Sequence, residues 1–411
     1  MTIEKSTFEN LIPSQFISFT FPNPLSTDPQ LNPYGNSLRI AVLDSLQPTS
    51  DPPQLAAMLV PKYREDDWIF STENGHLQLL SNLPGISRLI LVGNPPHDDD
   101  YFPIVYNRPI LDDDTIHYTK FEESMTPLLL ALSPKSTFIN GLPEIPFVTY
   151  EDNVIRSVSV KKCFGSCVGE MLVEDVEIDS LDTVREFRRR LRFKRMPNLV
   201  QTEMQIFHNN GIGDMEFRLD TGCLVHPYLP PMVASLSLIA RYLEECVCSG
   251  IMPRVLCIGV GGGALLTFLK KHFGFQVYGV ESDEMVVNVA KQYFGLVEDE
   301  LLRVCIGDGI EVVEKFAAKH NRGKMASGGI GDVENNQNVD VFGGLDTPFD
   351  IIMVDLDARD ARNGLGAPPM EFMRKQVLLA TKLALGKHGI LVVNVIPIVK
   401  TSSTQPQQTK I

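Results

Sequence analysis

The segment Val255-Leu-Cys-Ile-Gly-Val-Gly-Gly-Gly263 runs from an apolar strand directly into a cluster of glycines, and a helical pattern follows it. Gly259 and Gly261 permit a tight turn and let a ligand approach the backbone closely, because glycine carries no side chain. The amino end of the helix behind the turn favours an anionic group. A glycine turn alone is weak evidence for any one ligand, so its meaning depends on the pattern around it.

The alternation of strand and helix continues to residue 395. Strand-like apolar runs lie at 255–258, 276–280, 303–306, 349–354 and 389–395, and helical patterns lie between them at 264–272, 284–294, 310–319 and 370–385. This alternation predicts a parallel sheet with helices on both faces. A Gly- and Asn-rich insertion at 321–348 interrupts the pattern, and we expect it to be a disordered loop.

The composition and the apolar pattern change twice in the part of the chain that precedes this sheet. Residues 1–37 are rich in Pro, Ser, Thr and Asn, and we expect an irregular arm there. Residues 38–150 carry short apolar runs separated by short helices, a pattern that predicts a mixed α/β module. The runs lie at 39–43, 57–60, 68–70 and 88–92, and one of the helices at 75–83.

Residues 151–230 alternate apolar and polar side chains, which predicts a β-rich module of half-buried antiparallel strands. The expected strands lie at 169–178, 190–196 and 217–225. Seven basic residues cluster here: Arg185, Arg188, Arg189, Arg190, Arg192, Lys194 and Arg195. They predict either a solvated strand face beside acids or a substrate-facing patch. A helix at 232–246 then opens a Rossmann-like domain over 231–399, and 400–411 is a polar tail.

Composition narrows the class of protein. The 411 residues include 37 Lys and Arg against 51 Asp and Glu, a net charge of -14 that argues against a nucleic-acid partner. No run approaches the roughly 18 apolar residues of a membrane helix, and the first 30 residues lack the features of a leader. Seven cysteines and eight histidines match no metal-site spacing, so we expect no metal. These features predict a cytoplasmic protein with reduced thiols.

Acidic residues end the strands that follow the glycine turn. Glu281 ends the second strand, where a carboxylate can accept both hydrogens of a ribose diol, as it also does in NAD enzymes. Asp308 ends the third strand, within reach of an adenine amino group, and Asp355 ends the fourth, at the switch point of the sheet. Acids at all three strand ends resemble the layout of class I methyltransferases, and this resemblance favours S-adenosylmethionine as the cofactor.

Four motifs together resemble a known family. Gly259-Val-Gly-Gly-Gly263, Val280-Glu-Ser-Asp283, Gly307-Asp-Gly309 and Asp355-Leu-Asp357 are similar to the spermidine-synthase-like branch of class I methyltransferases. Within that branch the chain resembles the middle and C-terminal region of the methyltransferase-like thirteen family, whose members methylate a lysine and the N-terminus of translation elongation factor one alpha. Upstream segments such as Met58-Leu-Val-Pro61 and Pro197-Asn-Leu-Val-Gln-Thr-Glu203 extend the resemblance over roughly residues 38–399.

The resemblance implies a function and a set of site residues. It implies that the chain methylates a protein amine, an N-terminal α-amino group or a lysine, with elongation factor one alpha as a candidate substrate. The residues implied to hold the cofactor are Gly259, Gly261, Gly263, Glu281, Asp308, Gly309 and Asp355. Asp355 and Asp357 are the implied catalytic pair, which borders the acceptor amine.

Two features depart from the family pattern. The fifth strand, 389–395, is followed by Pro397 and a polar tail rather than by a helix and a final hairpin, which leaves an expected hydrophobic edge. The family's separate N-terminal methyltransferase domain has no counterpart in the chain. The exposed edge and the β-rich module make a homodimer plausible.

Three other functions stay open at this point. A catalytically weakened homologue that binds a cofactor or a protein fits the absent hairpin. A polyamine aminopropyltransferase fits the branch, although Ala358 stands where such enzymes carry a second acid three residues after the first. An NAD enzyme fits the glycine turn and Glu281, but the sequence offers no obvious acid or base for hydride transfer.

Overall fold

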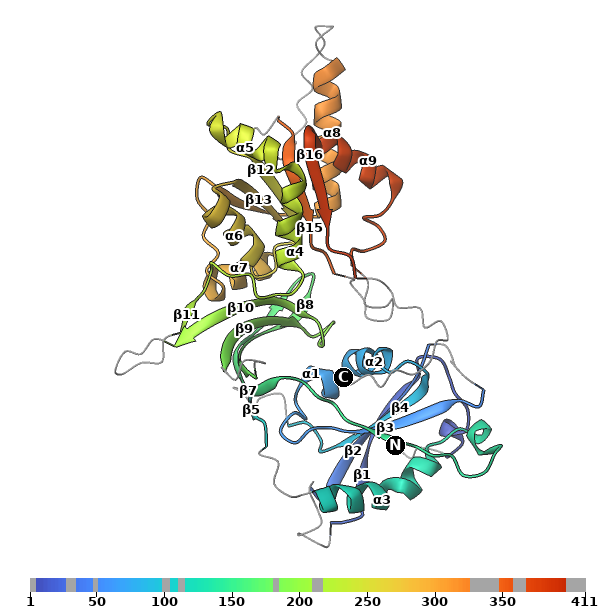
Figure 1. Cartoon of the computed structure of the whole chain (residues 1–411). Helices are drawn as coiled ribbons and strands as arrows, with labels where there is room; N and C mark the ends of the chain where they lie inside the picture. The colour runs from blue at the N-terminus through green and yellow to red at the C-terminus, as the bar shows by residue number, and fades with distance from the viewer. Residues whose placement is uncertain are drawn as a thin grey trace.

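The computed structural model describes residues 5–26, 35–46, 51–97, 104–109, 115–179, 185–208, 217–325, 347–357 and 367–396. The chain forms three β-sheets (Figure 1). They follow its order except that strand β5 (Val105–Asn107) of the second sheet precedes strand β6 (Phe147–Val148) of the first. The first is mixed, the second antiparallel and the third parallel, which confirms the predicted fold class of a Rossmann-like sheet behind a β-rich module and a mixed α/β module. Within these ranges, no helix combines the length and the apolar character that a membrane crossing requires.

The first sheet has the strand order β1-β2-β4-β3-β6. Its strands are β1 (Phe16–Pro22), β2 (Ser37–Asp44), β3 (Gln54–Leu59), β4 (Ile86–Gly93) and β6 (Phe147–Val148). Helix α3 (Thr115–Ala131) packs on one face, with Phe121 in its hydrophobic core. Helices α1 (Trp68–Ser71) and α2 (Glu73–Ser81) pack on the other, so the module has three layers. Short 3-10 helices lie at Lys5–Phe8 and Lys135–Phe138.

The prediction of an irregular arm over 1–37 is wrong for its central part. Residues 16–22 form β1, which pairs antiparallel with β2 from Phe16 opposite Leu43 to Pro22 opposite Ser37. The strand lies at the edge of the sheet and ends on Pro22, where the missing N–H leaves the ladder intact. Phe19 and Phe21 pack against the core beneath α3, and Phe16 packs against the core on the opposite face of the sheet; this burial outweighs the proline-rich composition.

The apolar run at 68–70 is helical, unlike the runs at 39–43, 57–60 and 88–92, most of whose residues lie in β2, β3 and β4. The Asp67 side chain accepts the Ile69 N–H at 3.1 Å and so caps α1. The Thr72 hydroxyl accepts the Gly75 N–H at 3.0 Å and caps α2. Two N-caps five residues apart start two short helices, and this capping decides against a strand.

A buried ion pair in the first sheet also binds the backbone of two segments that flank it, at residues 8–10 and at residue 132. The guanidinium of Arg88 on β4 donates to both carboxylate oxygens of Asp44 on β2, at 2.6 and 2.8 Å. The same guanidinium donates to the carbonyl oxygens of Phe8, Asn10 and Leu132. Both charged side chains are at most 1% exposed, so water cannot take the place of either partner if the other is removed.

We predict that buried His76 on α2 makes stability depend on pH. Burial and the positive charge of Arg39 lower its pKa to about 3, so the folded chain holds the ring neutral while the unfolded chain protonates it below about pH 6.5. Stability from this group is present above pH 6.5 and is lost as the pH falls toward 3. Between pH 7 and pH 5 the loss amounts to about 2 kcal/mol.

Urea unfolding of the wild type and of His76→Leu at the two pH values measures this effect. The wild type is expected to lose about 2 kcal/mol more than the variant between pH 7 and pH 5. His97→Leu is the control, because that ring is 63% exposed and its removal leaves the buried site intact. An equal loss in the wild type and His76→Leu would contradict the prediction.

The second sheet is antiparallel throughout, in the order β11-β10-β9-β8-β7-β5. Its strands are β5 (Val105–Asn107), β7 (Val154–Gly165), β8 (Gly169–Ile178), β9 (Glu186–Phe193), β10 (Val200–His208) and β11 (Phe217–Leu219). The strand predicted over 217–225 is thus only three residues long. It stops because the Asp220 side chain accepts the Gly222 N–H at 2.8 Å, which turns the chain.

The basic cluster on and around β9 is paired with acids. Arg188 and Arg190 both bind Glu203, Arg189 binds Asp175 in two hydrogen bonds, and Arg185 and Lys194 bind Glu177 and Glu170. These contacts support the interpretation of a strand face beside acids. They leave little of the cluster's charge for a substrate-facing patch.

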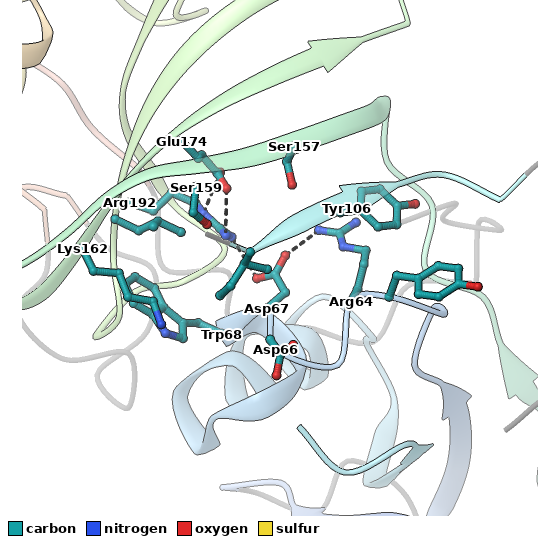
Figure 2. A pocket seen from close by; sticks show the side chains of 13 residues that line it. Arg64, Asp66, Asp67, Trp68, Tyr106, Ser157, Ser159, Lys162, Glu174 and Arg192 are labelled. Carbon is teal, nitrogen blue, oxygen red and sulfur yellow. Dashed lines mark hydrogen bonds and ion pairs between the residues drawn. The ribbon is translucent and has the colours of Figure 1, made fainter. Parts of the chain in front are cut away.

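The remaining arginine of β9 reaches the first module, as Figure 2 shows. Arg192 binds Glu174 at 2.9 Å and Asp67 at 3.0 Å, and Asp67 also binds Arg64 at 2.7 Å. The two arginines hold the pKa of Asp67 below its usual range despite its burial. This chain of ion pairs borders a cavity of about 30 Å³ and fastens α1 to the second sheet.

The third sheet is parallel in the order β14-β13-β12-β15-β16. Its strands are β12 (Arg254–Ile258), β13 (Gln276–Glu281), β14 (Leu302–Ile306), β15 (Phe349–Val354) and β16 (Leu385–Val393). One face is covered by α4 (Leu229–Ala234), α5 (Ala240–Cys248), α6 (Ala264–Phe273) and α7 (Glu284–Tyr293). The other is covered by α8 (Gly309–Met325) and α9 (Lys375–Ala384), as Figure 1 shows.

Some element boundaries differ from the prediction. The helix expected over 232–246 is split by a 3-10 helix at Ser235–Ile239, where the Ser235 hydroxyl bonds the Met232 carbonyl at 2.6 Å. The helix expected over 370–385 is limited to α9, and β16 begins at Leu385 because a bulge beside Phe349 takes up the following residues. Helix α8 reaches Met325, and most of the insertion at 321–348, like the tail at 400–411, lies outside the described residues.

One hydrophobic cluster joins the second and third sheets. It contains Met171 of β8 and Leu191 of β9 together with Leu266 of α6 and Val289 of α7. At its rim the carboxylate of Asp283, which caps α7, accepts the N–H groups of Cys167 and Val168 in the β7–β8 turn at 2.6 and 3.0 Å. The predicted boundary at residue 230 therefore lies between two sheets that share one core.

Candidate functional site

The glycine turn lies at the carboxyl edge of the parallel sheet, between β12 and α6. Gly259, Gly261 and Gly263 adopt φ values of 90°, 51° and 77°, in the left-handed region that favours glycine. A side chain at Gly259 would overlap the carbonyl oxygen of Asp355. The turn thus brings β12 directly against the end of β15, and this contact requires glycine.

Glu281 is the last residue of β13, and its carboxylate faces the turn. One oxygen accepts the Val260 N–H at 3.2 Å, and the other accepts the N–H groups of Ser282 and Asp283 at 2.9 and 3.2 Å. Burial raises the pKa of Glu281, and these backbone donors partly oppose that rise. The side chain is therefore held in place beside the turn, with acceptor lone pairs for a further donor.

Asp308 lies between β14 and α8. Its Oδ1 accepts the N–H groups of Ile310 and Glu311 at 2.8 and 3.3 Å, which orders the first turn of α8. Gly309 begins that helix, and a side chain there would overlap Ile258 of β12. Glycine therefore lets α8 start close to the glycine turn, with Asp308 at the same edge of the sheet.

Asp355 follows β15 at the centre of this edge. Its Oδ2 accepts the Tyr228 hydroxyl at 2.8 Å, and its Oδ1 accepts the Asn394 amide at 3.0 Å. Burial raises the pKa of Asp355, and the two hydrogen bonds oppose that rise. Burial and the neighbouring Asp355 carboxylate raise the pKa of Tyr228, whose hydroxyl stays protonated and donating. Two uncharged donors thus hold Asp355 in a defined orientation.

His226 borders the same group. Its Nε2 lies 3.0 Å from the Val200 carbonyl oxygen, and its ring centroid lies 4.3 Å from that of Tyr228. Because a carbonyl only accepts, Nε2 carries the hydrogen when the ring is neutral. Burial lowers the pKa of His226, so the neutral ring persists near pH 7. His226 thereby supports Tyr228, which in turn holds Asp355.

Asp357 lies two residues further on, and the antiparallel sheet occupies its carboxylate. The Arg195 guanidinium donates to Oδ1 at 2.8 Å, and the Gln201 amide donates to Oδ2 at 3.0 Å. Next to Gln201, the Thr202 hydroxyl accepts the Gly262 N–H at 2.7 Å. The first residues of β10 therefore form a wall over the carboxyl edge of the parallel sheet.

The structure brings all the sequence-predicted site residues to one edge of one sheet. Sequence reasoning assigned none of the residues that surround them to this edge: Tyr228, Asn394, Arg195, Gln201 and Thr202. It had placed Arg195 only in the basic cluster, and Gln201 and Thr202 only in a segment that carries the resemblance. Asn394 had a signal, because it is a polar residue directly after the fifth apolar strand, as the acids are after the others. The rest come from outside the parallel sheet, and no spacing in the sequence connects them to it.

The chemistry of this edge suits a nucleoside-bearing ligand. Carboxylates at the ends of β14 and β13, on one side of β12, and of β15, on its other side, are hydrogen-bond acceptors, and ribose hydroxyls and an adenine amino group are donors. Among the described residues, no group of three or more His, Cys, Asp or Glu side chains has the geometry of a metal site. The cavity of Figure 2 is separate, because none of the predicted site residues lines it.

The chain is similar to proteins named eEF1A lysine and N-terminal methyltransferase. It is 26% identical over 367 residues to the Xenopus laevis protein, and this alignment covers 83% of this chain and 45% of the relative. It is 24% identical over 390 residues to the Homo sapiens protein, with 88% and 48% covered. These relatives confirm the resemblance first drawn from the motifs, and the chain spans less than half of their length. No family model matches the chain.

Two solved structures align with parts of the chain. Human methyltransferase-like protein 13 in complex with SAH is 27% identical, covers 41% of this chain and 64% of that chain, and gives a TM-score of 0.32. A probable spermidine synthase from Corynebacterium glutamicum is 12% identical over 56% of this chain and 62% of that chain, with a TM-score of 0.34. Both alignments cover only part of each chain.

Proposed function

We propose that this chain is an S-adenosylmethionine-dependent methyltransferase that acts on a protein amine. The observation that carries the proposal is the set of carboxylates at the ends of β13, β14 and β15 around one glycine turn. The likeness over more than four fifths of the chain to the eEF1A methyltransferases supports it. The acceptor that we propose is the processed N-terminus or a lysine of that elongation factor, and the cytoplasm is the compartment that goes with it.

The proposed cofactor site uses Glu281 for the ribose diol and Asp308 for the adenine amino group. Gly259, Gly261 and Gly263 keep the turn free of side chains, and Gly309 keeps the start of α8 close to it. When bound, the cofactor supplies a methyl group already activated on a sulfonium sulfur. The chain therefore needs no covalent nucleophile, and its task is to orient the acceptor.

The proposed acceptor side is the carboxylate of Asp355. A negative charge there attracts an ammonium and aligns its nitrogen before the proton leaves. A partly buried position also lowers the pKa of the ammonium by removing water from it, which favours the neutral amine that transfer requires. Tyr228 and Asn394 hold the carboxylate in one orientation, and this constrains the direction of approach.

Calorimetric titration with S-adenosylmethionine tests the cofactor site. We expect micromolar binding by the wild type and a loss of about 10- to 100-fold in affinity for Glu281→Gln, because hydrogen bonds to a charged group contribute about 1.5–3 kcal/mol. Glu284→Gln is the matched control, since Glu284 is an exposed acid three residues away at the start of α7. Its affinity is expected to equal that of the wild type.

A folded wild-type chain that does not bind S-adenosylmethionine would overturn the proposal. If it binds, methyl transfer to a peptide with the processed N-terminus of eEF1A tests the acceptor. Binding without transfer to any eEF1A peptide would favour a cofactor-binding homologue. Turnover of putrescine with decarboxylated S-adenosylmethionine would instead identify an aminopropyltransferase.

A further inference from the structure

The antiparallel sheet contacts the loop after β15 through the carboxylate of Asp357. Arg195 follows β9 and Gln201 is the second residue of β10, and together they engage both oxygens of Asp357 at 2.8 and 3.0 Å. The side chains of Arg195 and Asp357 are 19% and 18% exposed, so the pair is mostly shielded from water and from salt. The guanidinium also lies 5.1 Å from the centre of the Phe193 ring, which helps to hold it.

The contact continues from this pair to the glycine turn. Thr202 donates its hydroxyl hydrogen to the Gln201 carbonyl at 2.8 Å and accepts the Gly262 N–H at 2.7 Å. Two consecutive residues of β10 thus touch both the loop after β15 and the turn after β12. A shift of Asp357 is therefore expected to move the wall that covers the glycine turn.

The two aspartates at this edge have different environments. Asp357 faces the cation Arg195, which neutralises its charge. Asp355 accepts hydrogen bonds from the Tyr228 hydroxyl and the Asn394 amide, and both of these donors are uncharged. A carboxylate that already binds a guanidinium attracts a second cation weakly, whereas one bound by neutral donors keeps its attraction for an ammonium.

We propose that Asp357 is a positioning residue that, with Arg195 and Gln201, latches the antiparallel sheet over the parallel sheet. Asp355 then is the carboxylate that meets the acceptor amine. This inference deepens the proposed function, because it assigns different tasks to the two aspartates of the implied catalytic pair. The role of Asp355 toward the acceptor amine rests on the proposed function. The latch itself is a matter of geometry and can be tested without turnover.

Exchanging the two charges separates a latch from a catalytic carboxylate. In the full chain, Arg195→Asp and Asp357→Arg each place like charges opposite each other, and the double variant restores opposite charges. We expect each single variant to lower kcat/KM for the eEF1A peptide by about tenfold or more, because small displacements in a transfer site are costly. The double variant is expected to recover to within about threefold of the wild type.

A double variant as inactive as Asp357→Arg would overturn the inference, because it would show that position 357 itself must carry a carboxylate. The control is the exchange of Lys194 and Glu170, a neighbouring pair on the same sheet. Its side chains are 37% and 46% exposed, and it is expected to change kcat/KM by less than about twofold.

Hydrogen exchange at the Gly262 amide tests the latch without cofactor or acceptor. The protection of this amide by Thr202 is expected to fall in both single variants and to return in the double variant. The melting temperatures of all three variants are measured in parallel. Unchanged Gly262 exchange in folded single variants would refute the latch. A wild type that fails to bind S-adenosylmethionine would refute the proposed function instead, and this readout would still decide the latch.

Discussion

Replacing Gly259 with alanine is expected to abolish cofactor binding and to destabilise the parallel sheet. The added Cβ would overlap the Asp355 carbonyl oxygen, and the φ of 90° is unfavourable for any side chain. Relief of the overlap requires β12 and β15 to separate where the Asp355 N–H donates to the Ile258 carbonyl oxygen. We expect a loss of about 3 kcal/mol or more in the free energy of unfolding and at least about a 100-fold loss in affinity for S-adenosylmethionine.

Gly274→Ala is the matched control for this prediction. Gly274 also has a positive φ, 65°, but an added Cβ there meets no atom within 4 Å. Its substitution is expected to cost about 1–2 kcal/mol of backbone strain and to leave cofactor affinity within about twofold of the wild type. Urea unfolding and calorimetry on both variants make the comparison. Equal effects of the two alanines would show that the contact with Asp355 is unimportant.

Replacing Arg88 with methionine is expected to unfold the first module or to destabilise it by about 3–5 kcal/mol. The variant leaves the Asp44 carboxylate buried without its cation and removes the donor to three backbone carbonyls. Removing one partner of a buried ion pair lowers stability strongly, because neither the remaining charge nor the carbonyl groups can form hydrogen bonds with water instead. Urea unfolding followed by the fluorescence of Trp68, the chain's single tryptophan, reports on this module directly.

Two further variants test the reason for that loss. Arg185→Met removes an exposed arginine that directly precedes β9 and is expected to change stability by less than about 0.5 kcal/mol. Arg88→Met combined with Asp44→Leu removes the uncompensated charge and is expected to recover part of the lost stability. A double variant no more stable than Arg88→Met would contradict the charge as the main cause, and a loss below about 1 kcal/mol in Arg88→Met would contradict the prediction itself.

The parallel sheet and its functional edge were predictable because their signals are local. Each strand of that sheet is a short apolar run. Glu281 and Asp355 directly follow two of these runs, and Asp308 follows a third after Gly307. Since the carboxyl ends of parallel strands lie at one edge, sequence position alone placed these acids together. The glycines belong to the same stretch of chain, so the turn and its acids needed no tertiary information.

The partners of the acids were not predictable, because their contacts join distant parts of the chain. Tyr228 is 127 residues from Asp355, and Arg195 is 162 residues from Asp357. Strand β1 was missed for a related reason, since its burial depends on β2 and α3 rather than on its own composition. The apolar run at Trp68 was ambiguous until its caps, Asp67 and Thr72, were seen to bind backbone N–H groups.

The hydrophobic cluster shared by the second and third sheets has a consequence for synthesis of the chain on the ribosome. Strands β8 and β9 emerge long before α6 and α7, which cover Met171 and Leu191. At about 5–20 residues per second, the apolar face of the antiparallel sheet waits several seconds for these helices. During that interval it is a surface for chaperones, whereas the first module already has both of its helical layers and can fold as it appears.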